Sequence, residues 1–222
     1  PFLIKSAADL VKLADLCNGT ITSTDTTIDF KTAHYAVTNN IDLSGVAISP
    51  ITPFSGVFDG RNYAISNLTI TPKDTVPTGL FGNVENATIK NVNITAGQFN
   101  VTATAHIYTG GIAGYAKTST IENCSFAGTI KSAAKDTIAG DSMPGTIVTA
   151  KNSAAVGGIV GFAKNTTISN SVFKGSVEAS DGQFVGGITA VSEGGEIKKC
   201  TIDKGARIYC AMNHCGGITA LA

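Results

Sequence analysis

One stretch of about twenty residues occurs twice in the chain. Residues 110–130 read GGIAGYAKTSTIENCSFAGTI, and residues 157–177 read GGIVGFAKNTTISNSVFKGSV. Looser copies lie at 79–97, 186–203 and 216–222. Self-similarity with a period of roughly 20–50 residues is typical of repeat architectures, in which each unit buries its apolar face against its neighbours. The repeats therefore limit the fold more than any other feature.

Each repeat has a corner glycine and an isoleucine about ten residues later. The corner glycines are Gly79, Gly111, Gly158, Gly187 and Gly217. The isoleucines are Ile89, Ile121, Ile168 and Ile197, and we place Ile65 of an earlier, divergent unit in the same column. The residues around them alternate between apolar and polar and are interrupted by Gly and Asn, which predicts short strands and tight turns. We therefore predict an all-β fold, a right-handed parallel β-helix (β-solenoid) with one coil per unit.

A column of asparagines is expected at one turn of this β-helix. The aligned repeats place Asn67, Asn91, Asn123 and Asn170 at equivalent positions, and Lys199 interrupts the series. Asparagine tolerates the turn conformation, and its amide can bond to the next coil. We therefore expect a ladder of side-chain amides along the stack.

The N-terminal segment has a helical pattern instead. Ser6 is a suitable N-cap with Asp9 three residues later, and Asn18–Gly19 is a stop signal. Apolar residues recur at helical spacing at Leu10, Leu13, Ala14 and Cys17. We expect residues 1–20 to form a short capping α-helix over the first coil. Residues 21–222 then form the β-solenoid, which we expect to continue past Ala222 or to be truncated there.

Charge and hydropathy exclude two classes of partner. The 16 Lys and Arg residues balance the 16 Asp and Glu residues, so the chain has no electrostatic footprint for nucleic acid. No apolar run approaches the roughly 20 residues of a membrane-spanning helix. We expect neither a nucleic-acid partner nor membrane insertion of this segment.

Short motifs in the repeats resemble a known family. GLFG, GGIAG and GGIVG are each followed by TIxN, and this combination is similar to the GLUG repeats of bacterial surface proteins and adhesins, including those of gut Bacteroidetes. The upstream FLIKSAADLVKLADLCNG is similar to the segment that usually precedes such repeats. Ala190 and Ala220 replace the final glycine of the motif. The resemblance implies a secreted or cell-surface, outer-membrane-anchored β-solenoid, and it implies no defined ligand.

Insertions between repeats all fall at one corner. From the last apolar residue of one unit to the next corner glycine there are 9, 17, 32, 14 and 15 residues. Aligned insertions in repeat proteins commonly form the binding face. The residues that we expect there to contact a glycan or a protein are Phe99, His106, Tyr108, Lys135, Asp136, Asp141, Lys151, Phe184 and His214. The alternative for the aromatic residues is that they pack inward and cover the long loops.

Carboxylates offer a second function class. Many parallel β-helices cleave or modify polysaccharides with clustered acidic residues. Asp59 with Arg61 is the candidate pair, although Asp before Gly is also typical of a tight turn. No carboxylate pair recurs at the coil spacing.

The cysteines leave several possibilities open. Cys210, His214 and Cys215 could contribute to a zinc site, Cys210 and Cys215 could form a disulfide, or both thiols could be buried and free. Cys124 and Cys200 align with an inward column and are expected to be core thiols.

We therefore expect a non-enzymatic bacterial surface module for adhesion or structure, with no catalytic residue, metal or cofactor. It would bind host or bacterial glycan or protein through its aligned loops. The alternatives are a polysaccharide-active lyase or hydrolase, and a passive stalk of a larger surface protein.

Overall fold

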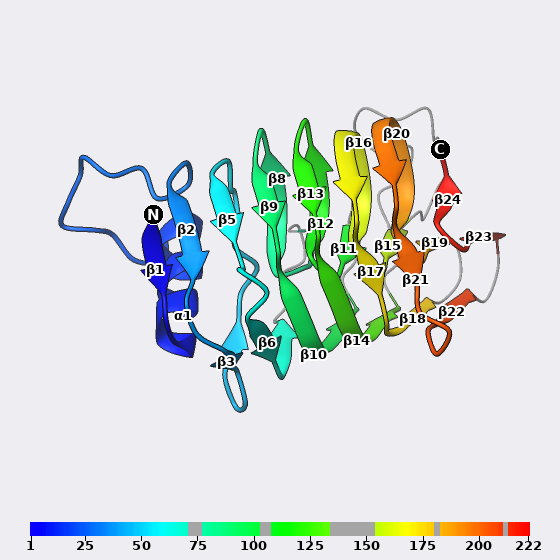
Figure 1. Ribbon diagram of the computed structural model, residues 1–222, viewed down its shortest axis with the longest axis horizontal. Helices are drawn as coiled ribbons and strands as arrows, with labels where there is room; N and C mark the ends of the chain where they lie inside the picture. Colours follow the sequence, from blue (N-terminus) through cyan, green and yellow to red (C-terminus); the bar gives the residue numbers. More distant parts are fainter. Residues whose placement is uncertain (71–76, 103–107, 134–153, 180–182, 211–212) are drawn as a thin grey trace.

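The computed structural model describes residues 1–70, 77–102, 108–133, 154–179, 183–210 and 213–222. In this part of the chain, short strands predominate and one short helix lies at the N-terminal end (Figure 1). The strands form three sheets with parallel pairing, and the repeats follow one another along the long axis of the molecule. The predicted β-rich class with parallel sheets is thus confirmed.

The first sheet contains ten strands. They are β1 (Phe2–Ile4), β2 (His34–Val37), β5 (Val57–Asp59), β8 (Phe81–Glu85), β9 (Thr88–Lys90), β12 (Ala113–Lys117), β13 (Thr120–Glu122), β16 (Val160–Ser169), β20 (Thr189–Lys198) and β24 (Thr219–Leu221). Strands β12 and β13 pair with different halves of β16, so the sheet bends within each repeat.

The second sheet also contains ten strands, and the third contains four. The second sheet comprises β3 (Ile41–Asp42), β4 (Ala47–Ile48), β6 (Ala64–Ser66), β7 (Leu68–Ile70), β10 (Asn93–Val101), β14 (Ser125–Ser132), β17 (Val172–Phe173), β18 (Ser176–Ala179), β21 (Thr201–Ile202) and β22 (Arg207–Cys210). The third comprises β11 (Tyr108–Gly110), β15 (Ala154–Gly157), β19 (Gln183–Gly186) and β23 (Asn213–Gly216).

The predicted isoleucine column is confirmed in four repeats and wrong in the earliest. Ile89, Ile121, Ile168 and Ile197 are successive register partners. Their first partner is Phe58, whereas Ile65 pairs with Ile94 in the second sheet. The early repeat has a longer corner between its two apolar positions, and this shifts Ile65 out of the expected column.

The predicted asparagine column is likewise confirmed in the later repeats and wrong in the earliest one. Asn91, Asn123, Asn170 and Lys199 have φ between 49 and 55° at the same corner, so Lys199 adopts the left-handed conformation that asparagine tolerates better. Asn67 also has a φ of 55°, but its amide bonds to Asp42 and Ser44 instead of joining this column.

A second left-handed column bends the first sheet. Asn86, Thr118, Asn165 and Gly194 have φ between 48 and 69°. They occupy the corner at which β8 meets β9 and β12 meets β13. Because this column mixes three residue types, the aligned repeats did not reveal it.

The paired glycines are required by close backbone approach. A Cβ on Gly111 would lie 2.5 Å from the carbonyl oxygen of Gly158 in the next repeat and would also overlap the Phe126 ring. Neither contact can be relieved by moving a flexible side chain alone. Glycine is therefore the residue that lets successive repeats approach at this corner.

Helix α1 (Ala7–Asn18) is formed as predicted. The Ser6 hydroxyl accepts a hydrogen bond from the Asp9 N–H, and Gly19 ends the helix with a φ of 71°. Its buried residues join the same apolar core that the three sheets enclose; they are Leu10, Leu13, Ala14 and Cys17.

Candidate functional site

The insertions between repeats begin and end at stacked positions. Val101, Ser132, Ala179 and Cys210 end their strands in the second sheet, and each is the register partner of the next. The third-sheet strands that follow the insertions are likewise in register with one another. The prediction that the insertions share one corner is therefore confirmed at the described ends of four of the five insertions; the first, after Ile70, is not in this register.

The predicted loop residues divide into two groups. His106, Lys135, Asp136, Asp141 and Lys151 lie outside the described residues.

Among the other four, three aromatic rings are buried. Phe99, Tyr108 and Phe184 are only 1%, 6% and 5% exposed. Phe99 lies in the main core, and all three rings are buried, which is the alternative that the sequence left open; they offer no free face to a ligand. His214 is exposed and stacks on Phe184, with ring centroids 4.8 Å apart.

Two of these rings belong to a second apolar cluster outside the main core. Its buried members are Tyr108, Ala155, Phe162, Phe184, Ala190 and Val191, and Tyr115, Ala220 and Leu221 pack against them. We call this set the elbow cluster. Val156 and Val185 point into the main core, whereas their strand neighbours Ala155 and Phe184 point the opposite way. The outer faces of the first and third sheets thus meet at the glycine corner.

Tyr115 is the half-buried edge of the elbow cluster. Its ring stacks on Phe162 and on Tyr108, with centroids 5.4 and 5.6 Å away. Burial raises the pKa of the Tyr115 hydroxyl, against the lowering effect of the nearby Lys164 and Lys117 ammonium groups. The hydroxyl is therefore neutral at physiological pH. The signal for this position was present in the sequence, since Tyr115 and Phe162 occupy equivalent places in the two closest repeats.

Ion pairs continue along the same outer face. Lys117 lies 2.6 Å from Glu85, and Lys164 lies 2.9 Å from Glu193. Their four positions are in register across β8, β12, β16 and β20. The pattern places two balanced pairs beside the elbow cluster.

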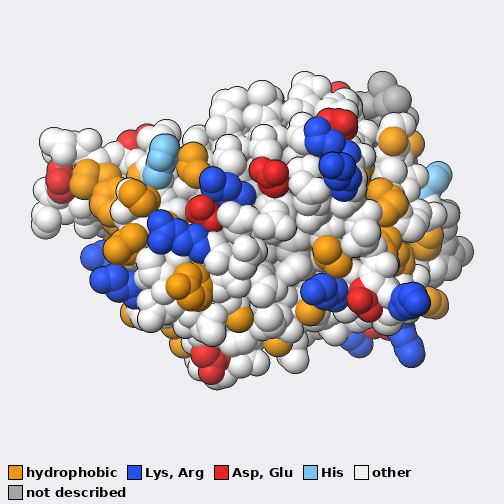
Figure 2. Space-filling view, viewed as in Figure 1, with side chains coloured by type: hydrophobic (Ala, Val, Ile, Leu, Met, Phe, Trp, Pro, Cys, Tyr) orange, Lys and Arg blue, Asp and Glu red, His pale blue; other side chains and the backbone are white. Residues whose placement is uncertain are grey.

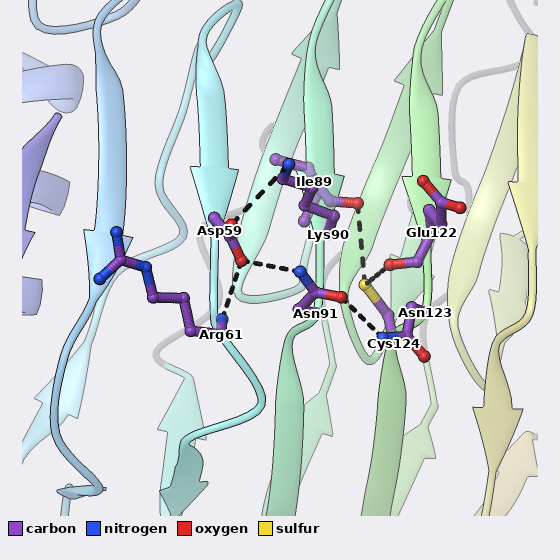
Figure 3. A network of polar contacts seen from close by, with 8 residues as sticks. All are labelled: Asp59, Arg61, Ile89, Lys90, Asn91, Glu122, Asn123 and Cys124. Atoms are coloured by element: carbon purple, nitrogen blue, oxygen red, sulfur yellow. Dashed lines mark hydrogen bonds and ion pairs between the residues drawn. The ribbon is translucent and has the colours of Figure 1, made fainter.

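Asp59, the candidate catalytic carboxylate, is engaged in the turn (Figure 3). Its Oδ1 atom accepts hydrogen bonds from the Asn91 amide and the Arg61 backbone N–H, both 2.9 Å long, and Lys90 lies 3.8 Å from Oδ2. Burial alone would raise the pKa of Asp59, but these hydrogen bonds and nearby positive charges outweigh burial and lower it. The Asp59 side chain is therefore ionised and held by the turn, as in the structural interpretation of the sequence.

Cys210 and Cys215 form a disulfide between β22 and β23. The sequence left open a zinc site, a disulfide and two free thiols. The disulfide is the one observed, and in this state neither sulfur is available as a zinc ligand. Among the described residues, no group of three or more His, Cys, Asp or Glu side chains could hold a metal ion. Cys124 is buried as predicted, whereas Cys200 is only partly buried and packs against the edge of the core.

Two hollows lie away from the elbow cluster. One of about 400 Å³ lies beside α1 and is lined by apolar residues that include Leu13, Ile21 and Phe30. A smaller polar one, about 270 Å³, is lined by Ser44, Asn67 and four neighbours on the second sheet. In Figure 2, charged side chains of both signs are interspersed, and hydrophobic ones gather towards the two ends. No described helix has the length and apolar character needed to cross a membrane.

Comparison with known proteins identifies the GLUG motif at residues 105–131. The chain is also similar to halomucin of Haloquadratum walsbyi (strain DSM 16790 / HBSQ001), with 31% identity over 110 residues. That alignment covers 43% of this chain and 1% of halomucin, so the chain matches only a small part of this relative. The motif and the similarity together indicate a surface or structural protein.

Proposed function

We propose that the chain is a non-enzymatic adhesion or structural module of a bacterial surface protein, built as a right-handed parallel β-helix. The parallel register from one repeat to the next supports this architecture. The GLUG motif and the similarity to halomucin support a secreted or cell-surface location. In the form of this proposal that we favour, the chain is part of a Bacteroidetes-type adhesin, which its repeat motifs resemble.

The stacked ends of the insertions are the observation that carries the proposal. Because Ser132, Ala179 and Cys210 are register partners, three successive insertions leave the second sheet from one line. Repeat proteins commonly use such aligned loops as an extended binding face. We propose that glycan or protein of a host or bacterial surface binds there, while the stacked repeats act as a rigid support.

The absence of catalysis is part of the proposal. Asp59 lies in a turn in which its carboxylate already accepts hydrogen bonds from Asn91 and Arg61. A general acid needs a raised pKa, whereas the pKa of Asp59 is lowered. These contacts support a structural role for the carboxylate in place of the polysaccharide-active alternative.

The test is a binding screen with a loop variant. The chain is applied to a glycan array and to immobilised extracellular-matrix proteins, alongside a variant in which residues 134–153 are replaced by a short Gly-Ser turn. A second variant carries a Gly-Ser segment of the original length, so that loop length and loop side chains are separated. Circular dichroism and thermal unfolding confirm that both variants are folded.

Loss of binding in both variants supports an adhesive face formed by the loop side chains. Loss in the shortened variant alone assigns the effect to spacing. If the native chain binds nothing, the adhesive part of the proposal is wrong and the passive-stalk alternative gains support. Degradation of a polysaccharide by the native chain would overturn the non-enzymatic assignment.

A further inference from the structure

We infer that Tyr115 is the stacking platform of a binding site for neutral pyranose sugars on the outer face of β12. This inference deepens the proposed function, on which it rests, by naming a site and a ligand class. The site consists of residues from β8, β12, β16 and β20. It combines a held aromatic ring, an exposed amide and two balanced ion pairs.

The ring of Tyr115 is held in place from one side. The centroids of Tyr115, Tyr108 and Phe162 lie 5.2 to 5.6 Å from one another, so the three rings form a nearly equilateral triangle. Seen from Tyr115, the two neighbouring rings therefore lie in similar directions. Phe162 is 0% and Tyr108 6% exposed, and their burial fixes the orientation of Tyr115. A fixed ring loses little conformational entropy when a ligand binds.

The register shows what lies on the other side of the ring. Across the sheet, perpendicular to the strands, Tyr115 is the register partner of Phe162 in β16 and of Asn83 in β8. Its plane lies within 20° of the Phe162 plane, so Phe162 covers one face. The opposite face is directed towards Asn83, whose side chain is short and exposed. Tyr115 is only partly buried, which agrees with an uncovered ring face on this side.

The surrounding polar groups select the ligand class. Lys117 and Glu85 follow Tyr115 and Asn83 by two residues, so they lie on the same outer face. Their side chains are 41% and 52% exposed and can bond to hydroxyl groups, as can the Asn83 amide. A pyranose ring combines an apolar C–H face, which packs on an aromatic ring, with hydroxyls at its rim. Because Lys117 and Lys164 are each paired with a glutamate, the site has no excess positive charge for an anionic sugar.

The ligand class is tested by saturation-transfer-difference NMR with the full chain. The probes are lactose, cellotriose, N,N′,N″-triacetylchitotriose and mannotriose, with 3′-sialyllactose as the anionic counterpart of lactose. We expect at least one neutral probe to receive saturation on its ring C–H protons. We expect 3′-sialyllactose to bind no more tightly than lactose.

Variants place the site on the molecule. Tyr115→Ala removes the platform and should weaken binding of the best neutral probe roughly tenfold or more, whereas Tyr115→Phe should keep most of it. Asn83→Phe leaves the cluster intact and covers the free ring face, so it should also abolish binding. Tyr209→Ala is the matched control, because Tyr209 is 60% exposed on the second sheet. It should bind like the native chain.

Three results would overturn the inference. If a probe binds and neither Tyr115→Ala nor Asn83→Phe weakens it, the site is elsewhere and the proposed adhesive function stands. If no neutral probe binds, Tyr115 is not a sugar platform; the proposed function is then judged separately by the loop variants on glycan arrays and matrix proteins. Preferential binding of 3′-sialyllactose would contradict the predicted ligand class.

Discussion

The side-chain amide of Asn123 donates a hydrogen bond to the side-chain oxygen of Asn91 one repeat earlier, with a length of 2.6 Å. Asn91 in turn donates to Asp59, so three repeats are joined at one corner by side chains alone. The backbone at Asn91 and Asn123 is left-handed, with φ near 55° and 53°. Each asparagine thus stabilises both the turn and the contact between repeats.

Substitution of Asn91 separates these two roles. Asn91→Ala removes both side-chain hydrogen bonds and places an alanine at positive φ, so we expect a loss of about 2 kcal/mol or more in the free energy of unfolding. Asn91→Gly removes the same hydrogen bonds but tolerates the backbone, and it should recover part of the loss. Urea denaturation of the three proteins measures the difference. A glycine variant as unstable as the alanine variant would show that the backbone conformation is not limiting.

The glycine corner gives a matched pair of positions. Gly111→Ala should destabilise the protein by about 3 kcal/mol, because the new methyl group overlaps the backbone of Gly158 and the ring of Phe126. Gly217 occupies the equivalent corner of the last repeat, but a Cβ there meets no atom within 4 Å. Gly217→Ala should therefore have a small effect on stability. Thermal unfolding of the two variants and the native chain measures the difference. Equal effects at the two positions would refute the close-approach explanation.

The carboxylate of Asp59 predicts a pH dependence. The pKa of Asp59 is lower in the folded protein than the ordinary value of 3.8. Its contribution to stability is therefore complete above that value and is lost as the pH falls through the lower, folded-state pKa. Asp59→Asn keeps a hydrogen-bond acceptor for Asn91 but no charge. We expect this variant to have a lower Tm than the native chain at pH 7, and we expect the difference to shrink below about pH 4. A constant difference in Tm down to pH 2 would contradict the assignment.

Reduction of the disulfide should affect the last repeats alone. The bond closes a short loop, since Cys210 and Cys215 are five residues apart, and such a loop contributes about 2 kcal/mol by chain entropy. Reduction, or Cys210→Ser with Cys215→Ser, should speed amide hydrogen exchange in β22, β23 and β24. Exchange in β8 and β9 should stay unchanged. Faster exchange throughout the chain would show that the disulfide supports the whole stack.

The free cysteines should differ in reactivity. Burial raises the pKa of the Cys17 and Cys124 thiols to about 12, and both side chains are 1% exposed. The Cys200 thiol, whose pKa is also raised by burial, is only partly buried. Iodoacetamide at pH 8 should therefore modify Cys200 first, as followed by peptide mass spectrometry. Modification of Cys124 in the folded chain at the rate of Cys200 would contradict its burial.

The sequence predicted the β-rich class with parallel sheets because its strongest repeats carry the register directly. Ile121 and Ile168 are partners in the structure as they are in the alignment. The earliest repeat was misaligned because Phe58 and Ile65 are both apolar residues followed by a polar one. Periodicity alone therefore could not distinguish them. The longer corner between these two positions decides the register, and corner length is set by three-dimensional packing.

The candidate site was less predictable for a related reason. Alternation along a strand predicts one inward and one outward face, and Phe184 and Tyr108 fall on the outward one. The glycine corner folds two outward faces against each other, so these residues are buried outside the main core. The sequence revealed the glycines but not the angle that they produce. Tyr115, at the open edge of this cluster, was therefore missed.

The parallel register has a mechanical consequence. The hydrogen bonds of all three sheets join one repeat to the next, so they point along the direction in which the repeats follow one another. A force applied between the two ends of the stack pulls along these bonds instead of across them. Every interface in the stack then carries the same load, the weakest interface opens first, and the protein should extend by releasing repeats singly from an end.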